Sequence, residues 1–315
     1  MLPDVKTNHV DRPQNELLDL ITLDIFRAVV RENGVTRAAA RLNRVQSNVT
    51  TRIKQLEEDL GVRLFTREGR RMALTPAGRE LLPFAERLLS LAGEARRSVC
   101  DVLPRGRFRL GAMESTAASR LPTMLANYRR TWRDVSIELV VDTSEALIQQ
   151  LRDFKLDAMF VAGPIDVSDL ILFECESVYF EELLLVTPHG HPPVLGPVDL
   201  KLDTMVAFDR GCSYRRVGEK WFANAGIQPE RIVEVEAYHA MLAWIAAGSG
   251  FGFVPRSTLE TVRHLEEVSV HSLGTLGRVE TLLVWREGHF SSALNALRTQ
   301  IAEQAAARLN ARAAA

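Results

Sequence analysis

The residues best suited to chemistry lie together between positions 46 and 54. Apolar side chains at positions 49, 53, 56 and 60 recur at helical spacing, so the sequence predicts a helix over 46–59 with one buried face. The opposite face carries amides, hydroxyls and basic groups, which are Gln46, Ser47, Asn48, Thr50, Thr51, Arg52 and Lys54. Amide side chains can form paired hydrogen bonds with adenine, and hydroxyls can serve several base edges. This pattern is typical of a helix that enters the major groove of DNA.

The neighbouring segments predict the elements that would position this helix on a duplex. Helices are expected over 19–33 and 37–42, and a tight turn at 43–45 precedes the third helix. Arg37 is a further candidate DNA contact. Residues 62–74 predict two short strands around a glycine-tipped turn, where Arg67 and Arg70 could reach phosphates or the minor groove. We therefore expect a winged helix-turn-helix.

The distribution of charge favours the same function. Residues 25–75 hold 11 Lys and Arg against 5 Asp and Glu, a surplus of six, in a chain of 315 residues with a net charge of −1. The rest of the chain therefore carries an excess of seven acidic residues. A basic module on an acidic body favours binding to the phosphate backbone of double-stranded DNA. A merely solvated basic face is the alternative.

A long helix is predicted to follow the winged module. It begins at Thr75 and Pro76, and Pro104 and Gly106 end it. Its apolar residues alternate three and four apart, at Leu81, Ala85, Leu88, Ala92, Ala95, Val99 and Val102. This heptad pattern predicts helix pairing, hence a homodimer on an inverted-repeat operator. The alternative is that the stripe packs only on its own chain.

The remainder of the chain has the pattern of an α/β domain. After Gly106, short apolar strands alternate with helices, and a second set of strands begins near position 182. We expect a winged module at 18–75, a linker at 76–104 and an effector-binding domain at 105–311. Its first lobe would comprise 105–177 and 280–311, and its second lobe 178–279.

Candidate ligand-binding residues lie where the predicted strands end. In open α/β sheets, ligands bind beyond the carboxyl ends of the strands, where helix amides point toward them. The residues at these positions are Glu114, Ser115, Thr116, Thr143, Ser144, Gly163, Cys212, Ser213, Tyr214 and His239. Such hydroxyl-rich ends suit a small carboxylate or an amino-acid-like anion. The alternatives are that the hydroxyls are helix caps, that His239 is a satisfied polar group and that Cys212 is a packed thiol.

Several other classes of protein are disfavoured. No signal peptide or apolar run of membrane-spanning length is present, so we expect a cytoplasmic protein without a membrane partner. The three cysteines form no C-x-x-C pair, which argues against a zinc site and a disulfide framework. We expect neither a metal nor another cofactor.

The N-terminal motifs resemble those of the LysR-type transcriptional regulators. The resemblance is carried by Arg37 to Leu42, Gln46 to Glu58, Gly61 to Phe65, and Leu74 to Gly78. Val45 stands where the family usually has serine, and Thr51 where arginine is frequent, so the chain departs from the family pattern at two positions of the base-reading region. The resemblance implies a two-lobed effector domain like the periplasmic binding proteins, and dimers that often assemble into homotetramers.

Three other functions remain as alternatives. An enzyme is disfavoured because the sequence around Gly248 and Gly250 fits neither a nucleophile elbow nor a dinucleotide loop. A solute-binding protein of the same sensor fold would need a signal peptide. A thiol-based redox sensor would use Cys212, because nearby Arg215 and Arg216 would favour its thiolate.

Overall fold

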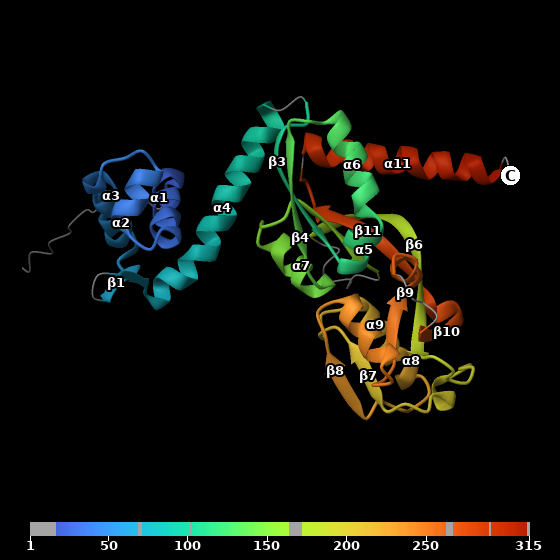
Figure 1. The fold of residues 1–315 in the computed structure, drawn as a ribbon. Coiled ribbons are helices and arrows are strands. Elements are labelled where there is room, and N and C mark those ends of the chain that lie inside the picture. The colour runs from blue at the N-terminus through green and yellow to red at the C-terminus, as the bar shows by residue number, and fades with distance from the viewer. Residues whose placement is uncertain are drawn as a thin grey trace, which may run out of the picture. The chain divides into compact units, whose positions relative to one another are not determined.

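The structure of the protein is a computed structural model that describes residues 17–68, 71–100, 103–163, 172–262, 267–289 and 291–313 (Figure 1). The chain divides into two compact units, one ending at Gly93 and the other beginning at Glu94, and each is considered separately. Within the described ranges, no helix combines the length and the apolar character that crossing a membrane requires.

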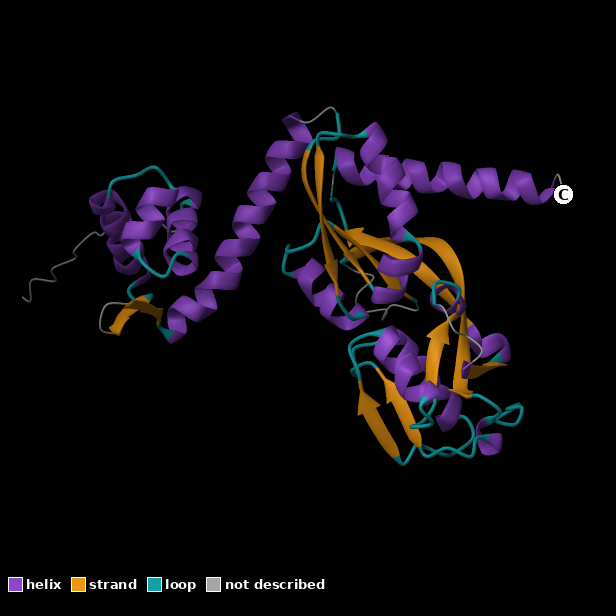
Figure 2. Cartoon of the chain, in the orientation of Figure 1, coloured by secondary structure: helices purple, strands orange, loops and turns teal. Residues whose placement is uncertain are grey.

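The N-terminal unit is a cluster of three helices followed by a two-stranded wing (Figure 2). Its elements are α1 (Leu20–Arg31), α2 (Val35–Arg41), α3 (Gln46–Leu60), β1 (Phe65–Glu68), β2 (Arg71–Leu74) and the first part of α4 (Pro76–Cys100). Asp19 caps α1 by accepting hydrogen bonds from the amides of Ile21 and Thr22, and Gly61 ends α3 in the left-handed conformation. The predicted winged helix-turn-helix is confirmed.

The helix α4 begins at Pro76, as predicted, and continues through Pro83. Leu81 and Ala85, two positions of the predicted heptad seam, pack into the core of the N-terminal unit instead. Val102, the last predicted position, lies outside the described residues. The large apolar side chains that α4 exposes are Phe84, Leu88, Leu91 and Val99. The exposed stripe is thus displaced from the predicted one, because the winged unit uses the first turns of α4 to close its own core.

The first lobe of the second unit is a sheet covered by helices on both faces (Figure 2). Its elements are β3 (Gly106–Ala112), α5 (Glu114–Ser119), α6 (Leu121–Thr131), β4 (Val135–Val141), α7 (Ser144–Arg152), β5 (Ala158–Ala162), the start of β6 (Phe173–Pro188), β11 (Arg278–Arg286) and α11 (Ser292–Ala313). Every residue of β5 is buried, since α7 covers one face of the sheet and α6 and α11 cover the other.

The second lobe repeats the α/β arrangement on a smaller scale. Its elements are the end of β6, η1 (Pro197–Asp199), β7 (Thr204–Ala207), α8 (Ser213–Ala223), β8 (Arg231–Glu234), α9 (Tyr238–Ala246), β9 (Gly252–Pro255), α10 (Arg256–Leu259), β10 (Val268–Ser272) and η3 (Gly274–Gly277). The parallel strands β7 and β8 form a separate pair, and Met205 of β7 bridges to Phe251. The predicted α/β class and two-lobed architecture are confirmed.

One strand passes through both lobes without a break. Strand β6 pairs with β11 from Phe173 to Glu182 and with β9 from Leu183 to Val186 (Figure 1). The sequence predicts a strand only from about 182, because residues 174–177 are exposed and polar and hide the strand pattern. The second set of strands therefore shares a continuous backbone with the first.

A buried charge network fixes the last part of α4 to the first lobe. Glu94 accepts a hydrogen bond from Nη2 of Arg286 at 2.9 Å and forms an ion pair with Nδ1 of His289. All three side chains are buried, and Nη1 of Arg286 donates to the carbonyl oxygens of Leu151 and Leu156. Glu94 therefore belongs to the core of the sensor unit.

Candidate functional site

The first candidate site is the polar face of α3. Gln46, Ser47 and Asn48 are exposed at its first turn, as are Thr51, Arg52 and Lys54 further along, and Thr50 is half-buried. Val49, Ile53 and Leu56 are buried beneath them, as predicted. Leu60 was expected on the buried face but is exposed, because α3 ends there and the chain turns away at Gly61.

Neighbouring side chains orient the first turn of α3. The hydroxyl of Thr36 donates to Oε1 of Gln46 at 3.2 Å, and Nη1 of Arg44 donates to Oδ1 of Asn48 at 3.3 Å. Both contacts engage the side-chain oxygens, and both residues are exposed. Arg37, also exposed, holds the end of α1 by donating to the carbonyl oxygens of residues 32 and 33.

The wing is anchored to α3 by one buried carboxylate. Oε1 of Glu57 accepts hydrogen bonds from the amides of Leu64 at 2.8 Å and Phe65 at 3.1 Å, and Oε2 accepts from Nη1 of Arg63 at 2.9 Å. The sequence analysis assigns no role to this glutamate, although its place beside the core face of α3 is the signal that could have indicated one. The two predicted wing contacts are Arg67 and Arg70. The side chain of Arg67 and the whole of Arg70 lie outside the described parts of the chain.

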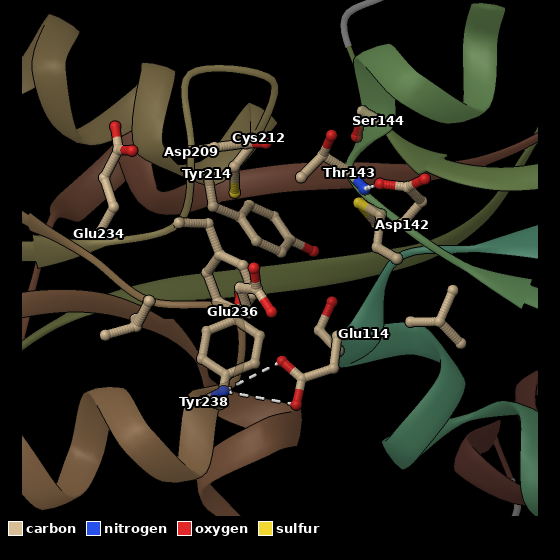
Figure 3. Close-up of a pocket in the computed structure, with 15 residues that line it drawn as sticks. Glu114, Asp142, Thr143, Ser144, Asp209, Cys212, Tyr214, Glu234, Glu236 and Tyr238 are labelled. Carbon is tan, nitrogen blue, oxygen red and sulfur yellow. Dashed lines mark hydrogen bonds between the residues drawn. The ribbon is translucent and has the colours of Figure 1, made fainter.

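The second candidate site is a cavity of about 410 Å³ between the two lobes of the sensor unit (Figure 3). The predicted ligand-binding residues that line it are Glu114, Ser115, Thr143, Ser144, Cys212 and Tyr214. The four that do not are Thr116, Gly163, Ser213 and His239. Thr116 is buried, and Ser213 accepts a hydrogen bond from Arg216. His239 is exposed, so strand-end position alone overpredicts the lining.

The lining residues that sequence reasoning missed are mostly acidic or apolar. They are Met113, Val141, Asp142, Phe208, Asp209, Glu234, Val235, Glu236 and Tyr238. Asp142, Asp209 and Glu236 stand at the same strand ends as the predicted hydroxyls. A count of carboxylates at those ends would have found them.

The helix amides expected to bind an anion already have acceptors within the protein. At α7, the amide of Thr143 donates to Oδ1 of Asp142 at 2.9 Å, and that of Glu145 donates to the carbonyl oxygen of Gly211 at 3.3 Å. At α9, the amide of Tyr238 donates to Glu114 at 3.1 Å. These three amides are therefore already paired, and the acidic lining opposes an anionic ligand.

Burial controls the ionisable groups that line this cavity. Burial raises the pKa of Glu114, although the amide of Tyr238 opposes this by favouring the carboxylate. Burial also raises the pKa of both Tyr214 and Tyr238, so both remain neutral phenols.

The surroundings of Cys212 act on the pKa of its thiol in both directions, and Arg216 lowers that pKa as the redox alternative expects. Burial raises the pKa of its thiol, and donation from the amides of Arg215 and Tyr214 only partly opposes this. The guanidinium of Arg215, expected to favour the thiolate, is instead bound to Glu219, Glu234 and the carbonyl oxygen of Phe208.

Two family models match the chain and together cover both units. Residues 20–79 match "Bacterial regulatory helix-turn-helix protein, lysR family", and residues 102–306 match "LysR substrate binding domain". The HTH-type transcriptional regulator GltR of Bacillus subtilis is 35% identical over 81% of this chain and 86% of its own length. The HTH-type transcriptional regulator CzcR of Bacillus thuringiensis is 32% identical over 89% of this chain and 92% of its own length.

Solved structures of similar fold also extend over both units. Full-length OxyR C199D from Pseudomonas aeruginosa matches with a TM-score of 0.68 and 18% identity, over 90% of this chain and 95% of that one. Full-length CbnR complexed with its target DNA matches with a TM-score of 0.63 and 23% identity, over 91% of this chain and 99% of that one. At these identities the likeness concerns the fold.

Proposed function

Because this chain belongs to the LysR family of DNA-binding transcription regulators, we propose that it reads its operator with the polar face of α3 and adjusts that binding to a small molecule held between its two sensor lobes. The observation that carries this proposal is the outward polar face of α3, whose amides are oriented by Thr36 and Arg44. Amide side chains held in this way suit paired hydrogen bonds with adenine.

The roles along α3 differ with position. Gln46, Ser47 and Asn48 reach base edges, because the N-terminal end of a recognition helix enters the groove first. Thr50 and Thr51 serve neighbouring base edges, and Arg52 and Lys54 hold phosphates. Arg37, Arg67 and Arg70 add backbone or minor-groove contacts.

The operator is an inverted repeat bound by a homodimer. The exposed stripe of Phe84, Leu88, Leu91 and Val99 on α4 supports helix pairing, because a monomer would leave it in water. Dimers assemble further into a homotetramer. Ligand binding closes the lobes and changes the angle between paired winged modules, and hence the bend of the operator.

The effector occupies the cavity lined by Glu114, Ser144 and Tyr214. The small carboxylate expected from the sequence is replaced in this proposal, because the lining is acidic and the helix amides are occupied.

A thiol-based switch at Cys212 is the second candidate. Reversible loss of DNA binding under peroxide, abolished by Cys212→Ser, would favour it. The relatives are named as transcriptional regulators, and no catalytic step is proposed.

The operator is tested by selecting duplexes from a random library with the full-length protein. We expect an inverted repeat whose half-sites lie about one helical turn, or a multiple of it, apart. In fluorescence anisotropy, Gln46→Ala and Asn48→Ala should each weaken binding by about tenfold to a hundredfold and relax specificity at one base pair. The exposed control Gln55→Ala on α3 should bind normally. Selection of no common sequence would contradict the proposal.

A further inference from the structure

The charge of the effector cavity is strongly one-sided. Five of its fifteen lining residues are carboxylic acids, Glu114, Asp142, Asp209, Glu234 and Glu236, and none is Lys, Arg or His. An acidic wall by itself specifies no ligand, so the partners of each carboxylate decide how much charge is left for one.

Among the described residues, Glu234 is the one lining acid that forms an ion pair with an arginine. Nη1 of the buried Arg215 donates to Glu234 at 2.7 Å, and Nε of the same guanidinium donates to Glu219 at 2.8 Å. In Figure 3 the carboxylate of Glu234 accordingly lies at the edge of the view, away from the other labelled acids.

The other four carboxylates have only neutral hydrogen-bond donors. Asp142 accepts from the amide of Thr143 and the side chain of Gln150, and Asp209 accepts from the amide of Gly211 at 2.9 Å. Glu114 accepts from the amide of Tyr238. Across the described ranges, no ion pair joins any of the four, Glu236 included, to Lys or Arg. The exposed His239 acts on Glu114 through its charge alone.

These four acids face one another across the two lobes. Glu114 and Asp142 follow β3 and β4 in the first lobe, whereas Asp209 and Glu236 follow β7 and β8 in the second. Figure 3 shows Glu236 and Tyr214 extending from one side toward Glu114 on the other. Like charges on opposed walls repel, so a ligand that bridges them must be positive on both sides.

A buried hydroxyl provides an independent sign of a missing ligand atom. Ser144, in the first turn of α7, is 2% exposed and lines the cavity, and its Oγ has no hydrogen-bond partner. Figure 3 places Ser144 beside Thr143 on the first-lobe wall of the cavity. An unsatisfied buried polar group is unfavourable. A ligand N–H that donates to Oγ of Ser144 would remove this cost.

Aromatic rings complete the wall. Phe208, Tyr214 and Tyr238 line the cavity, and the rings of Phe208 and Tyr238 lie 4.8 Å apart between centroids. Carboxylates together with aromatic faces are the groups that attract organic ammonium ions. Within the described parts of the chain, no three His, Cys, Asp or Glu side chains are grouped to hold a metal ion.

We propose that the cavity binds a small organic dication without a carboxylate, of the class of alkane diamines and guanidino-amines. One cationic end lies between Glu114 and Glu236, and the other is held by Asp142 and Asp209 with an N–H donated to Ser144. This inference rests on the proposed function in that it assigns the ligand of the same effector cavity.

Calorimetric titration of the full-length protein with 1,4-diaminobutane and agmatine tests the proposal. Succinate and 1,4-butanediol serve as matched probes of opposite and of zero charge. We expect both amines to bind, more weakly as salt is raised, and neither matched probe to bind. Glu236→Gln should weaken amine binding by about tenfold or more, because a charge-assisted contact is lost. Ser144→Ala should weaken it by about threefold to tenfold.

The control variant is Glu230→Gln, an exposed carboxylate of the second lobe that does not line the cavity and should leave binding unchanged. Four results would each overturn the proposal. They are preference for succinate, equal amine affinities of Glu236→Gln and Glu230→Gln, exclusion of the amine by Zn²⁺, and no amine binding at millimolar concentration.

Operator binding is measured on the same preparations. If the unmodified protein binds its selected operator but no amine, the proposed regulatory function stands and only the proposed ligand class is wrong. An unmodified protein that binds amine but selects no operator removes the regulator and leaves the ligand class.

Discussion

The winged unit and the sensor unit use charge in opposite ways. Among the described residues, the winged unit buries one charged side chain, Glu57, and leaves its basic surplus at the surface. The sensor unit buries several, which are Glu94, Asp157, Glu181, Arg215 and Arg286. Surface charge contributes little to stability but can meet phosphates, whereas buried charge must be paired within the fold. Removing a charge should therefore change DNA affinity in one unit and the free energy of unfolding in the other.

The largest effect is expected for Glu94→Ala in the sensor unit. It leaves Arg286 buried without its carboxylate, which should lower the free energy of unfolding by about 3–5 kcal/mol. Urea denaturation followed by tryptophan fluorescence measures this, since all four tryptophans lie in the sensor unit. Glu138→Ala, which removes an exposed partner of Arg107, should cost less than about 1 kcal/mol. Equal losses would break the comparison.

The same carboxylate should make the sensor unit sensitive to acid. Burial raises the pKa of Glu94, but His289 and Arg286 outweigh it and hold that pKa below 4.5. A depressed pKa contributes stability above 4.5, and this contribution is lost as pH falls through the lower folded-state value. In Glu94→Ala, the free energy of unfolding measured by urea denaturation should therefore depend less on pH below 4.5 than it does in the unmodified protein.

Glu57→Ala tests the one buried charge of the winged unit. Two amides lose their acceptor, which should lower the stability of that unit by about 1–3 kcal/mol. In a urea titration, circular dichroism should show the loss of helix in this unit at a lower urea concentration. The unfolding transition followed by tryptophan fluorescence should be unchanged. The neighbouring exposed Glu58→Ala is the control and should have little effect. A shift of the tryptophan transition would be the contrary result.

A smaller effect is expected for the helix cap at Asp19. Asp19→Ala should cost about 0.5–2 kcal/mol of winged-unit stability. The hydroxyl of Thr22 and the amides of residues 21 and 22 lower the pKa of Asp19, so its contribution is lost as pH falls below 3.8. Asp19→Asn keeps the cap without the titration, so it should retain stability but lose this pH dependence. Identical pH profiles for Asp19→Asn and the unmodified protein would contradict this.

The smallest effect on stability is expected for Lys54→Ala. The free energy of unfolding should change by less than about 0.5 kcal/mol, but the salt slope of operator binding should fall by about one. Anisotropy at several salt concentrations measures this slope. Lys201→Ala, an exposed lysine of the sensor unit, should leave the slope unchanged.

The sequence predicts the α3 face better than it predicts the cavity, for a physical reason. Val49, Ile53 and Leu56 belong to one helix, so their period alone identifies the opposite face. The cavity joins residues from six helices and strands and the loops between them. Whether a helix amide is free depends on contacts such as that between Glu114 and Tyr238. Local sequence pattern does not predict that contact, so the sequence expectation of an anionic ligand took no account of it.

The first two positions of the α4 stripe and the length of β6 were predicted wrongly for related reasons. The heptad pattern fits Leu81 and Ala85, but tertiary packing in the winged core takes both residues out of the stripe. The first half of β6 lacks the alternation of apolar and polar residues that predicts a strand. This segment forms a strand because it pairs with β11.

The continuous strand β6, which runs from one lobe into the other, has a mechanical consequence. A flexible joint of loop residues would let the lobes rotate freely, whereas a continuous hydrogen-bonded strand resists rotation and must absorb it as twist along its length. Rotation of one lobe against the other would then store elastic energy as added twist in β6. Release of this twist would return the sensor to its resting geometry once the cavity empties.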